Sequence, residues 1–200
     1  MQFIAPGEIG IIVLDNFLNN EEVEDALSFL NEMYESDVCG EDGKGVKTKQ
    51  RTGQLKFVSH YKSRMFNGVC HRIAQYLGTD LSRAEQAQFL KYGKGQKYEP
   101  HYDAFDKRNE NEWKHYAANG GQRIYTAMVY LNDVHDGGTT LFPKLGIDIQ
   151  PRKGRLLVWK NVGEDLTVPH PDSLHGGMPV GKKTEKICFT LWFRENPTTS

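Results

Sequence analysis

The early part of the chain carries apolar residues at helical spacing. The first stripe has members at i, i+3, i+4 and i+7, namely Val23, Ala26, Leu27 and Leu30. Asn19 or Asn20 can cap this helix. A second helical stripe runs through residues 62–77 and ends at a glycine. A short apolar run at 9–14, rich in β-branched residues, predicts a strand before both helices.

After residue 86 apolar and polar positions alternate, which is the spacing of strands. We expect strands at 88–92, around 101–103, and at 123–131, 139–142, 154–159 and 187–194. Two helices followed by about eight short strands favour a mainly β fold of the α+β type, with closed or double-sheet antiparallel strands and the helices packed on one sheet. One domain would span 1–200, with helical support at about 15–80 and the β core at about 85–195.

Two polar stretches interrupt this pattern. Residues 37–54 are rich in glycine and lysine, and residues 105–122 are irregular, with Trp113 exposed among charges. Each stretch is either a solvated surface loop or a flap over an active site. In the second interpretation Arg51 would touch substrate.

The last strand predicts a polar cavity. Alternation puts one set of side chains on one face, Lys186, Cys188, Thr190 and Trp192, and a purely apolar set on the other, Ile187, Phe189, Leu191 and Phe193. A lysine inside a barrel is costly unless an anion pairs with it. That anion is either a protein carboxylate or the carboxylate of a bound small acid. Hydroxyls on facing strands could add hydrogen bonds to such an acid: Tyr92, Thr126, Tyr130 and Thr140.

A candidate metal site lies between these strands. His101 and Asp103 are two residues apart, so on an extended strand both side chains point to the same face. His175, from a distant strand, can supply a third ligand. Two histidines and one carboxylate leave coordination positions open, which suits ferrous iron in oxygen chemistry. A His-x-Asp pair alone is a weak signal, and it gains weight only from the other parts of the cavity.

Composition indicates where the protein is located and which kinds of partner it binds. The formal net charge of −1 gives no general attraction to nucleic acid or to an anionic membrane. No apolar run approaches the length of a membrane span, and the first residues do not resemble a signal peptide. Three widely spaced cysteines form no CxxC pair and no disulfide framework. We therefore expect a cytoplasmic, reducing location, with no nucleic-acid or membrane partner.

Four longer stretches match one known family. They are residues 95–103 (GQKYEPHYD), 120–132 (GGQRIYTAMVYLN), 137–143 (GGTTLFP) and 175–180 (HGGMPV). In these stretches, and in Lys186 placed six residues before Trp192, the chain resembles the prolyl 4-hydroxylase family of Fe(II)- and 2-oxoglutarate-dependent dioxygenases. One departure is Thr139, which stands where the family usually has glutamate.

The resemblance implies a double-stranded β-helix, the jelly roll also found in cupins. It implies that His101, Asp103 and His175 hold Fe(II), and that Lys186 meets the far carboxylate of 2-oxoglutarate. Further hydrogen-bond partners of that carboxylate would be Tyr92, Tyr130 and Thr140. The reaction would consume O2, hydroxylate a C–H bond and convert 2-oxoglutarate to succinate and CO2. Ascorbate would help to keep the iron ferrous.

The resemblance also implies a substrate, a proline-containing peptide or protein lying in a groove under the two flaps. Groove residues, by position, would be Arg51, Glu85, Tyr98 and Trp192, although Tyr98 and Trp192 could equally be core aromatics. Arg194 stands where a plant-type relative carries histidine, so the chemistry of the groove could differ. Two alternatives stay open: the same oxygenase chemistry on another side chain or a small molecule, and a non-catalytic cupin-like metal-binding module. The protein would be a monomer or a homodimer.

Overall fold

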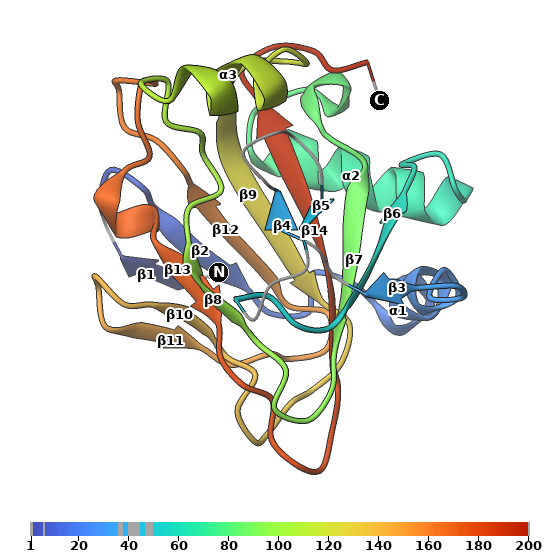
Figure 1. Ribbon diagram of the computed structural model, residues 1–200. Helices are drawn as coiled ribbons and strands as arrows, with labels where there is room; N and C mark the ends of the chain where they lie inside the picture. Colours follow the sequence, from blue (N-terminus) through green and yellow to red (C-terminus); the bar gives the residue numbers. More distant parts are fainter. Residues whose placement is uncertain (1, 6, 36–37, 40–44, 47–49, 200) are drawn as a thin grey trace.

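The computed structural model describes residues 2–5, 7–35, 38–39, 45–46 and 50–199 (Figure 1). Its helices are α1 (Asn20–Leu27), α2 (Arg64–Tyr76) and α3 (Glu110–Tyr116), with 3-10 turns η1 (Leu81–Arg83) and η2 (Pro171–Ser173). Its strands are β1 (Gln2–Ala5), β2 (Ile11–Leu14), β3 (Tyr34–Glu35), β4 (Val38–Cys39), β5 (Gly45–Val46), β6 (Gln54–Val58), β7 (Ala87–Tyr92), β8 (Tyr98–His101), β9 (Arg123–Tyr130), β10 (Thr140–Phe142), β11 (Ile147–Ile149), β12 (Leu156–Lys160), β13 (His175–Gly177) and β14 (Lys186–Arg194).

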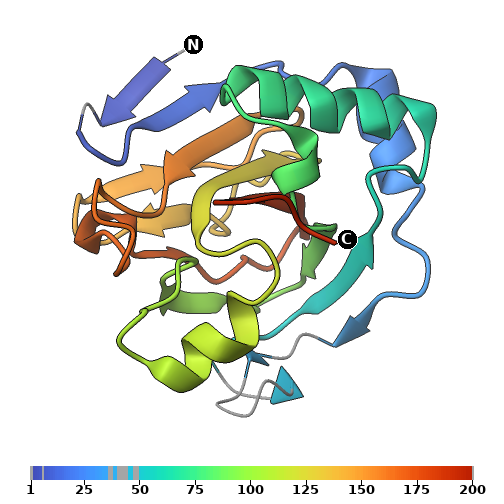
Figure 2. The same ribbon diagram turned by 90° about the horizontal axis from the view of Figure 1, so that it is seen from above.

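Two antiparallel sheets build the jelly roll that the sequence predicted. The large sheet has the strand order β1-β2-β12-β9-β14-β7-β6-β3, and the small sheet has the order β11-β10-β13-β8. Helices α1 and α2 pack on one face of the large sheet, which we call the helix face (Figure 2). The small sheet lies against the opposite face, which we call the pocket face.

Strand alternation sorts residues between these two faces, as expected. On β9, Ala127 and Val129 join the core under α2, whereas Met128 and Tyr130 join the core shared with the small sheet. On β14 the same rule holds, since Phe189 packs on the helix face and Cys188 on the pocket face. The alternation therefore gives each central strand one apolar side and one side turned toward the site.

The predicted N-terminal helices are present with recognisable caps. The amide of Glu22 donates to the side chain of Asn19 at 2.9 Å, and the amide of Asn19 donates to the Glu22 carboxylate at 3.0 Å, so a capping box begins α1. Helix α2 begins after Ser63, whose hydroxyl accepts from the amide of Phe66. Within the described residues, none of the helices has the length and apolar character to cross a membrane.

The two stretches expected to be irregular contain regular structure. Helix α3 occupies the middle of 105–122, and Trp113 is half-buried, with the Lys107 ammonium 4.6 Å from its ring centroid, so the expectation of an irregular stretch with an exposed tryptophan was wrong. The helix is short and polar, so it lacks the long apolar stripe that periodicity detects. The other stretch includes β4, β5 and the start of β6, while 37, 40–44 and 47–49 lie outside the described residues.

Candidate active site

A pocket opens between the two sheets, lined by residues of both. Strand β14 lines it with the four side chains that alternation had placed on one face: Lys186, Cys188, Thr190 and Trp192. The small sheet and the turn after β8 contribute His101, Asp103 and His175 to the opposite wall. The pocket therefore brings the expected metal ligands and the expected lysine into one cavity.

The candidate ligands converge because β8 and β13 are neighbours. His175 lies opposite His101 in the antiparallel register, and Asp103 follows two residues later. His101 Nε2 is 3.6 Å from Asp103 Oδ1, and His175 Nε2 is 3.5 Å from Asp103 Oδ2. One ligand atom from each of the three residues lies within 4.8 Å of the others. A Cβ on Gly176 would stand 3.0 Å from Tyr98 O, so glycine lets β13 approach β8 closely.

Hydrogen bonds set the tautomer of both histidines. His101 Nδ1 is 2.8 Å from the carbonyl of Glu99, and His175 Nδ1 is 2.9 Å from the carbonyl of Ser173. A carbonyl only accepts, so Nδ1 carries the proton and the Nε2 lone pair is available for a metal. This is the arrangement typical of metal-binding histidines.

Electrostatics support the same assignment. Burial lowers the pKa of His175 to about 4, although Asp103 opposes the shift, so this imidazole is neutral at pH 7. Burial disfavours an ionised Asp103, but His175, His101 and the Arg123 charge together hold the pKa of this carboxyl below its ordinary value. A neutral imidazole and an ionised carboxylate are the forms that bind a divalent metal, and the donor set fits Fe(II).

Lys186 is a buried cation in the wall of the pocket. The residue is 2% exposed, and its Nζ donates to Thr140 Oγ1 at 3.4 Å. No carboxylate in the described part of the chain forms an ion pair with it. Burial lowers the pKa of this ammonium. Of the two anions that the sequence left open, the described residues supply no protein carboxylate, so the site fits an acid that enters from outside.

The expected hydroxyl partners surround this lysine at different depths. The Tyr130 hydroxyl donates to Thr140 Oγ1 at 2.7 Å, and Thr140 in turn accepts from Lys186. Tyr130 does not line the pocket but contacts Lys186, whose Nζ lies 5.4 Å from its ring centroid, whereas Thr140 and Tyr92 form part of the pocket wall. Burial raises the pKa of Tyr92 to about 12, so its phenol is neutral at pH 7. Tyr92 is therefore not the anion that pairs with Lys186.

Three of the four expected groove residues also line the pocket. Arg51 is 7% exposed, donates to Gln88 Oε1 at 2.7 Å and lies over the ring of Tyr98 at 4.7 Å. Tyr98 stacks on His101 with ring centroids 3.6 Å apart. Trp192 forms another part of the wall. Arg51 and Tyr98 thus connect the pocket wall to a candidate metal ligand.

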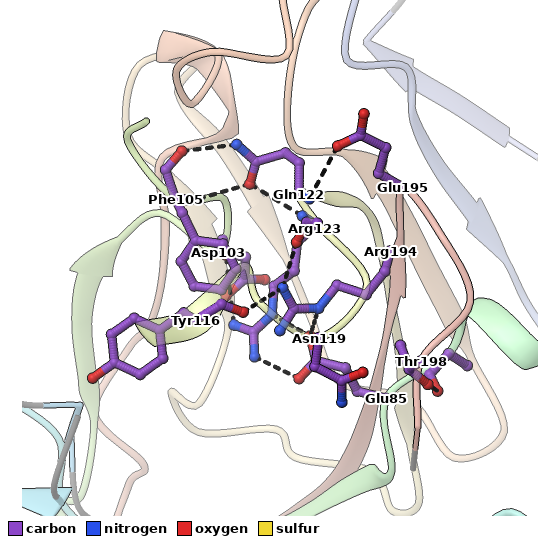
Figure 3. Close-up of polar contacts among 12 residues, drawn as sticks. Glu85, Asp103, Phe105, Tyr116, Asn119, Gln122, Arg123, Arg194, Glu195 and Thr198 are labelled. Atoms are coloured by element: carbon purple, nitrogen blue, oxygen red, sulfur yellow. Dashed lines mark hydrogen bonds and ion pairs between the residues drawn. The ribbon is translucent and has the colours of Figure 1, made fainter. Parts of the chain in front are cut away.

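Glu85, the fourth, lies behind the wall in a cluster of charges (Figure 3). Its carboxylate accepts from Arg123 Nε at 2.6 Å and lies 2.6 Å from Arg194 Nε. Burial disfavours its ionised form, but the two guanidinium groups hold the pKa of Glu85 below its ordinary value. Arg123 stacks on the ring of Trp192 at 3.9 Å, so Glu85 contacts the pocket wall through a second residue.

Two other buried hydroxyls of the pocket region have contacts that the sequence did not predict. The Thr190 hydroxyl has no hydrogen-bond partner among the described residues, and alternation had already placed it on the pocket face. Thr126 was noted only as a possible carboxylate partner, yet its hydroxyl donates to Asp103 Oδ2 at 2.7 Å. Strand parity had placed Thr126 on the face of Tyr130, but it does not show that the Thr126 hydroxyl bonds to Asp103.

A jelly roll that encloses two histidines, one carboxylate and a buried lysine defines a class of metal-dependent oxygenases. Residues 87–194 match the family model described as the 2OG-Fe(II) oxygenase superfamily. Prolyl 4-hydroxylase 5 of Arabidopsis thaliana is 36% identical over 91% of this chain and 67% of its own length. Probable prolyl 4-hydroxylase 3 of the same plant is 36% identical over 90% of this chain and 67% of its own length.

The fold of this chain is also similar to that of a solved structure. The viral collagen prolyl hydroxylase of Paramecium Bursaria Chlorella virus-1, in its 2OG complex, superposes with a TM-score of 0.70 and 25% identity, covering 92% of this chain and 95% of that one. The chain therefore belongs to the prolyl 4-hydroxylase family of the 2OG-Fe(II) oxygenases. This confirms the resemblance read from the sequence, and with it a 2-oxoglutarate-dependent dioxygenase that uses Fe(II) and 2-oxoglutarate.

Proposed function

We propose that this enzyme hydroxylates prolyl residues of a peptide or protein and converts 2-oxoglutarate to succinate and CO2 in the same reaction. One observation carries the proposal: the cluster of His101, Asp103 and His175 shares a pocket with Lys186, which has no ion-pair partner in the described residues. The names of the relatives, which are prolyl 4-hydroxylases, support proline as the target.

The residues of the pocket have distinct roles in this proposal. His101, Asp103 and His175 would hold Fe(II). With 2-oxoglutarate and O2, the bound iron supplies the oxidising chemistry that hydroxylates a C–H bond. Lys186 binds the far carboxylate of 2-oxoglutarate. Its hydrogen-bond partners there would be Tyr92, Thr140 and, through Thr140, Tyr130.

The peptide would lie at the open side of the pocket. A prolyl residue has no amide N–H, so its recognition depends on its ring and on peptide carbonyls. Arg51 and the Trp192 indole N–H are donors that could reach such carbonyls, and the Trp192 nitrogen has no partner within the described residues. The ring of Tyr98 provides an apolar surface beside His101. Glu85 would act indirectly, since it holds Arg123 against Trp192.

Mass spectrometry of a peptide library tests the proposal. The enzyme is incubated with Fe(II), 2-oxoglutarate, O2 and proline-containing peptides, and the product should carry one added oxygen on a prolyl residue. Asp103→Ala, which lacks the only charged ligand of the three, should give neither product nor succinate. Succinate without any peptide product would indicate another substrate. Bound iron without succinate would indicate a binding module, and either outcome would overturn the prolyl assignment.

Ascorbate is proposed as the reductant that keeps the iron ferrous between turnovers. The test is the number of turnovers completed with and without ascorbate, and equal numbers would exclude this role. A cytoplasmic location and a monomeric or homodimeric state are predictions that rest on the sequence alone.

A further inference from the structure

Two candidate metal ligands are connected to one buried residue that touches neither of them. Asn161, which follows β12, is fully buried. Its Nδ2 donates to the Thr126 hydroxyl at 2.8 Å, and that hydroxyl donates to Asp103 Oδ2 at 2.7 Å. A hydroxyl has one proton to donate, and the carboxylate accepts from the hydroxyl at the shorter distance, so the amide serves as the donor that satisfies the Thr126 oxygen.

The backbone carbonyl of Asn161 leads to the other ligand. It accepts from the amide of His170 at 2.9 Å, while the Ser173 hydroxyl lies 3.1 Å from it and 2.8 Å from the carbonyl of His170, its closer acceptor. The carbonyl of Ser173 then accepts from His175 Nδ1 at 2.9 Å. Ser173 is also fully buried, so water does not replace these bonds.

Both ligands need such support because the sheets hold them weakly. Asp103 lies two residues beyond the end of β8, outside the strand ladder. His175 is the first residue of a three-residue strand whose register with β8 is interrupted after it. Their separation of 3.5 Å therefore depends on side-chain and turn hydrogen bonds rather than on regular strand pairing.

We infer that the Asn161 side chain is a positioning group of the metal site, which sets Asp103 through Thr126, while the Asn161 backbone carbonyl holds the turn at 170–173 that precedes His175. The inference rests on the proposed function, because it takes these two residues as metal ligands. Outer-shell groups of this kind orient the ligands and typically change metal affinity by about 10- to 100-fold when they are removed.

Cobalt(II) titration of the metal-free protein tests the inference without any turnover. Absorption bands of Co(II) report ligand geometry, and a competing chelator gives the affinity. Asn161→Ala should weaken Co(II) binding by about 10- to 100-fold and change the spectrum. Thr126→Val, which keeps the shape and loses the hydroxyl, should do the same, whereas Thr126→Ser should keep the wild-type values. Asn67→Ala is the matched control, because the Asn67 amide nitrogen on α2 has no partner in the described residues.

Thermal unfolding of the metal-free variants separates positioning from general stability. A purely structural role would lower the melting temperature and leave Co(II) affinity and spectrum unchanged in the folded fraction, and that result would overturn the inference. Equal Co(II) binding by Thr126→Val and Thr126→Ser would also overturn it, even if Asn161→Ala failed to fold. Absence of Co(II) binding by the wild-type protein would instead overturn the ligand assignment on which both proposals depend.

Discussion

At the scale of single residues, Lys186 decides what the pocket accepts. Its ammonium group is removed from water, and among the described residues its one hydrogen bond is to the Thr140 hydroxyl. A buried cation without an anion destabilises the fold, so the binding of a carboxylate at this position recovers part of that cost. In the role proposed for it, Lys186 would therefore link the stability of the protein without cosubstrate to its affinity for 2-oxoglutarate.

Lys186→Ala should weaken 2-oxoglutarate binding while leaving the metal site intact. Loss of one partner of a buried, hydrogen-bonded charge pair costs about 2–5 kcal/mol, so the apparent KM for 2-oxoglutarate should rise by about 30-fold or more. Co(II) affinity should be unchanged, and Lys186→Arg should recover part of the lost affinity because it keeps the charge. An unchanged KM in Lys186→Ala would place the cosubstrate elsewhere.

At the scale of elements, a charged cluster attaches α3 to the rest of the fold (Figure 3). Arg194, near the end of β14, contacts Glu85 and donates through Nη1 to the carbonyl of Tyr116 at 2.9 Å and to that of Gly121 at 2.6 Å. The buried Gln122 side chain donates to the carbonyl of Phe105 and accepts from its amide, both at 2.8 Å, and so joins the two ends of the segment. These contacts hold the segment 105–122 against the end of β14.

Arg194→Ala should loosen the α3 segment. Removing the guanidinium leaves two carbonyls without their donor and halves the positive charge around Glu85. Amide hydrogen exchange at Ala117 and Gly121 should become faster by about tenfold or more. Arg108→Ala is the control, since that arginine lies in the same segment in an exposed pair with Asp106. Equal exchange in both variants would show that Arg194 does not anchor the segment.

At the scale of the whole molecule, the large sheet separates a stabilising core from the site. On the helix face, Phe66, Phe89 and Phe189 pack with ring centroids 5.2–5.6 Å apart. On the pocket face the same strands carry Gln88 and Cys188. Because neighbouring residues of a strand point to opposite faces, one sheet serves both purposes without sharing side chains between them.

Phe89→Ala should therefore lower stability with little effect on the pocket. Truncation of a fully buried phenylalanine costs about 3–5 kcal/mol of unfolding free energy, which denaturant titration would measure. Phe57→Ala on the adjacent strand β6 is the matched control, because this side chain is 45% exposed and its loss should change stability by about 0.5 kcal/mol or less. Co(II) affinity of folded Phe89→Ala should equal that of the wild type, and a large decrease would show that the two faces are coupled.

Local spacing in the sequence predicted most of the β core, the two N-terminal helices and the side of β14 that lines the pocket. A period of two or of 3.6 depends only on residues close together in the chain, so β9, β14 and α2 were predictable one at a time. The same rule placed Lys186 and Thr190 on one face. It did not find α3 or β11, which are too short to show a period.

The amino-acid sequence alone determined the family, the face of each central strand and the three residues proposed to hold iron. Tertiary structure decided which residues support them: that Glu85 pairs with Arg123 and Arg194 behind the pocket wall, and that Asn161 connects Asp103 with His175. The physical reason is distance along the chain. Thr126 and Asn161 are 35 residues apart and carry no shared spacing, so only the folded sheets bring their hydrogen bonds together.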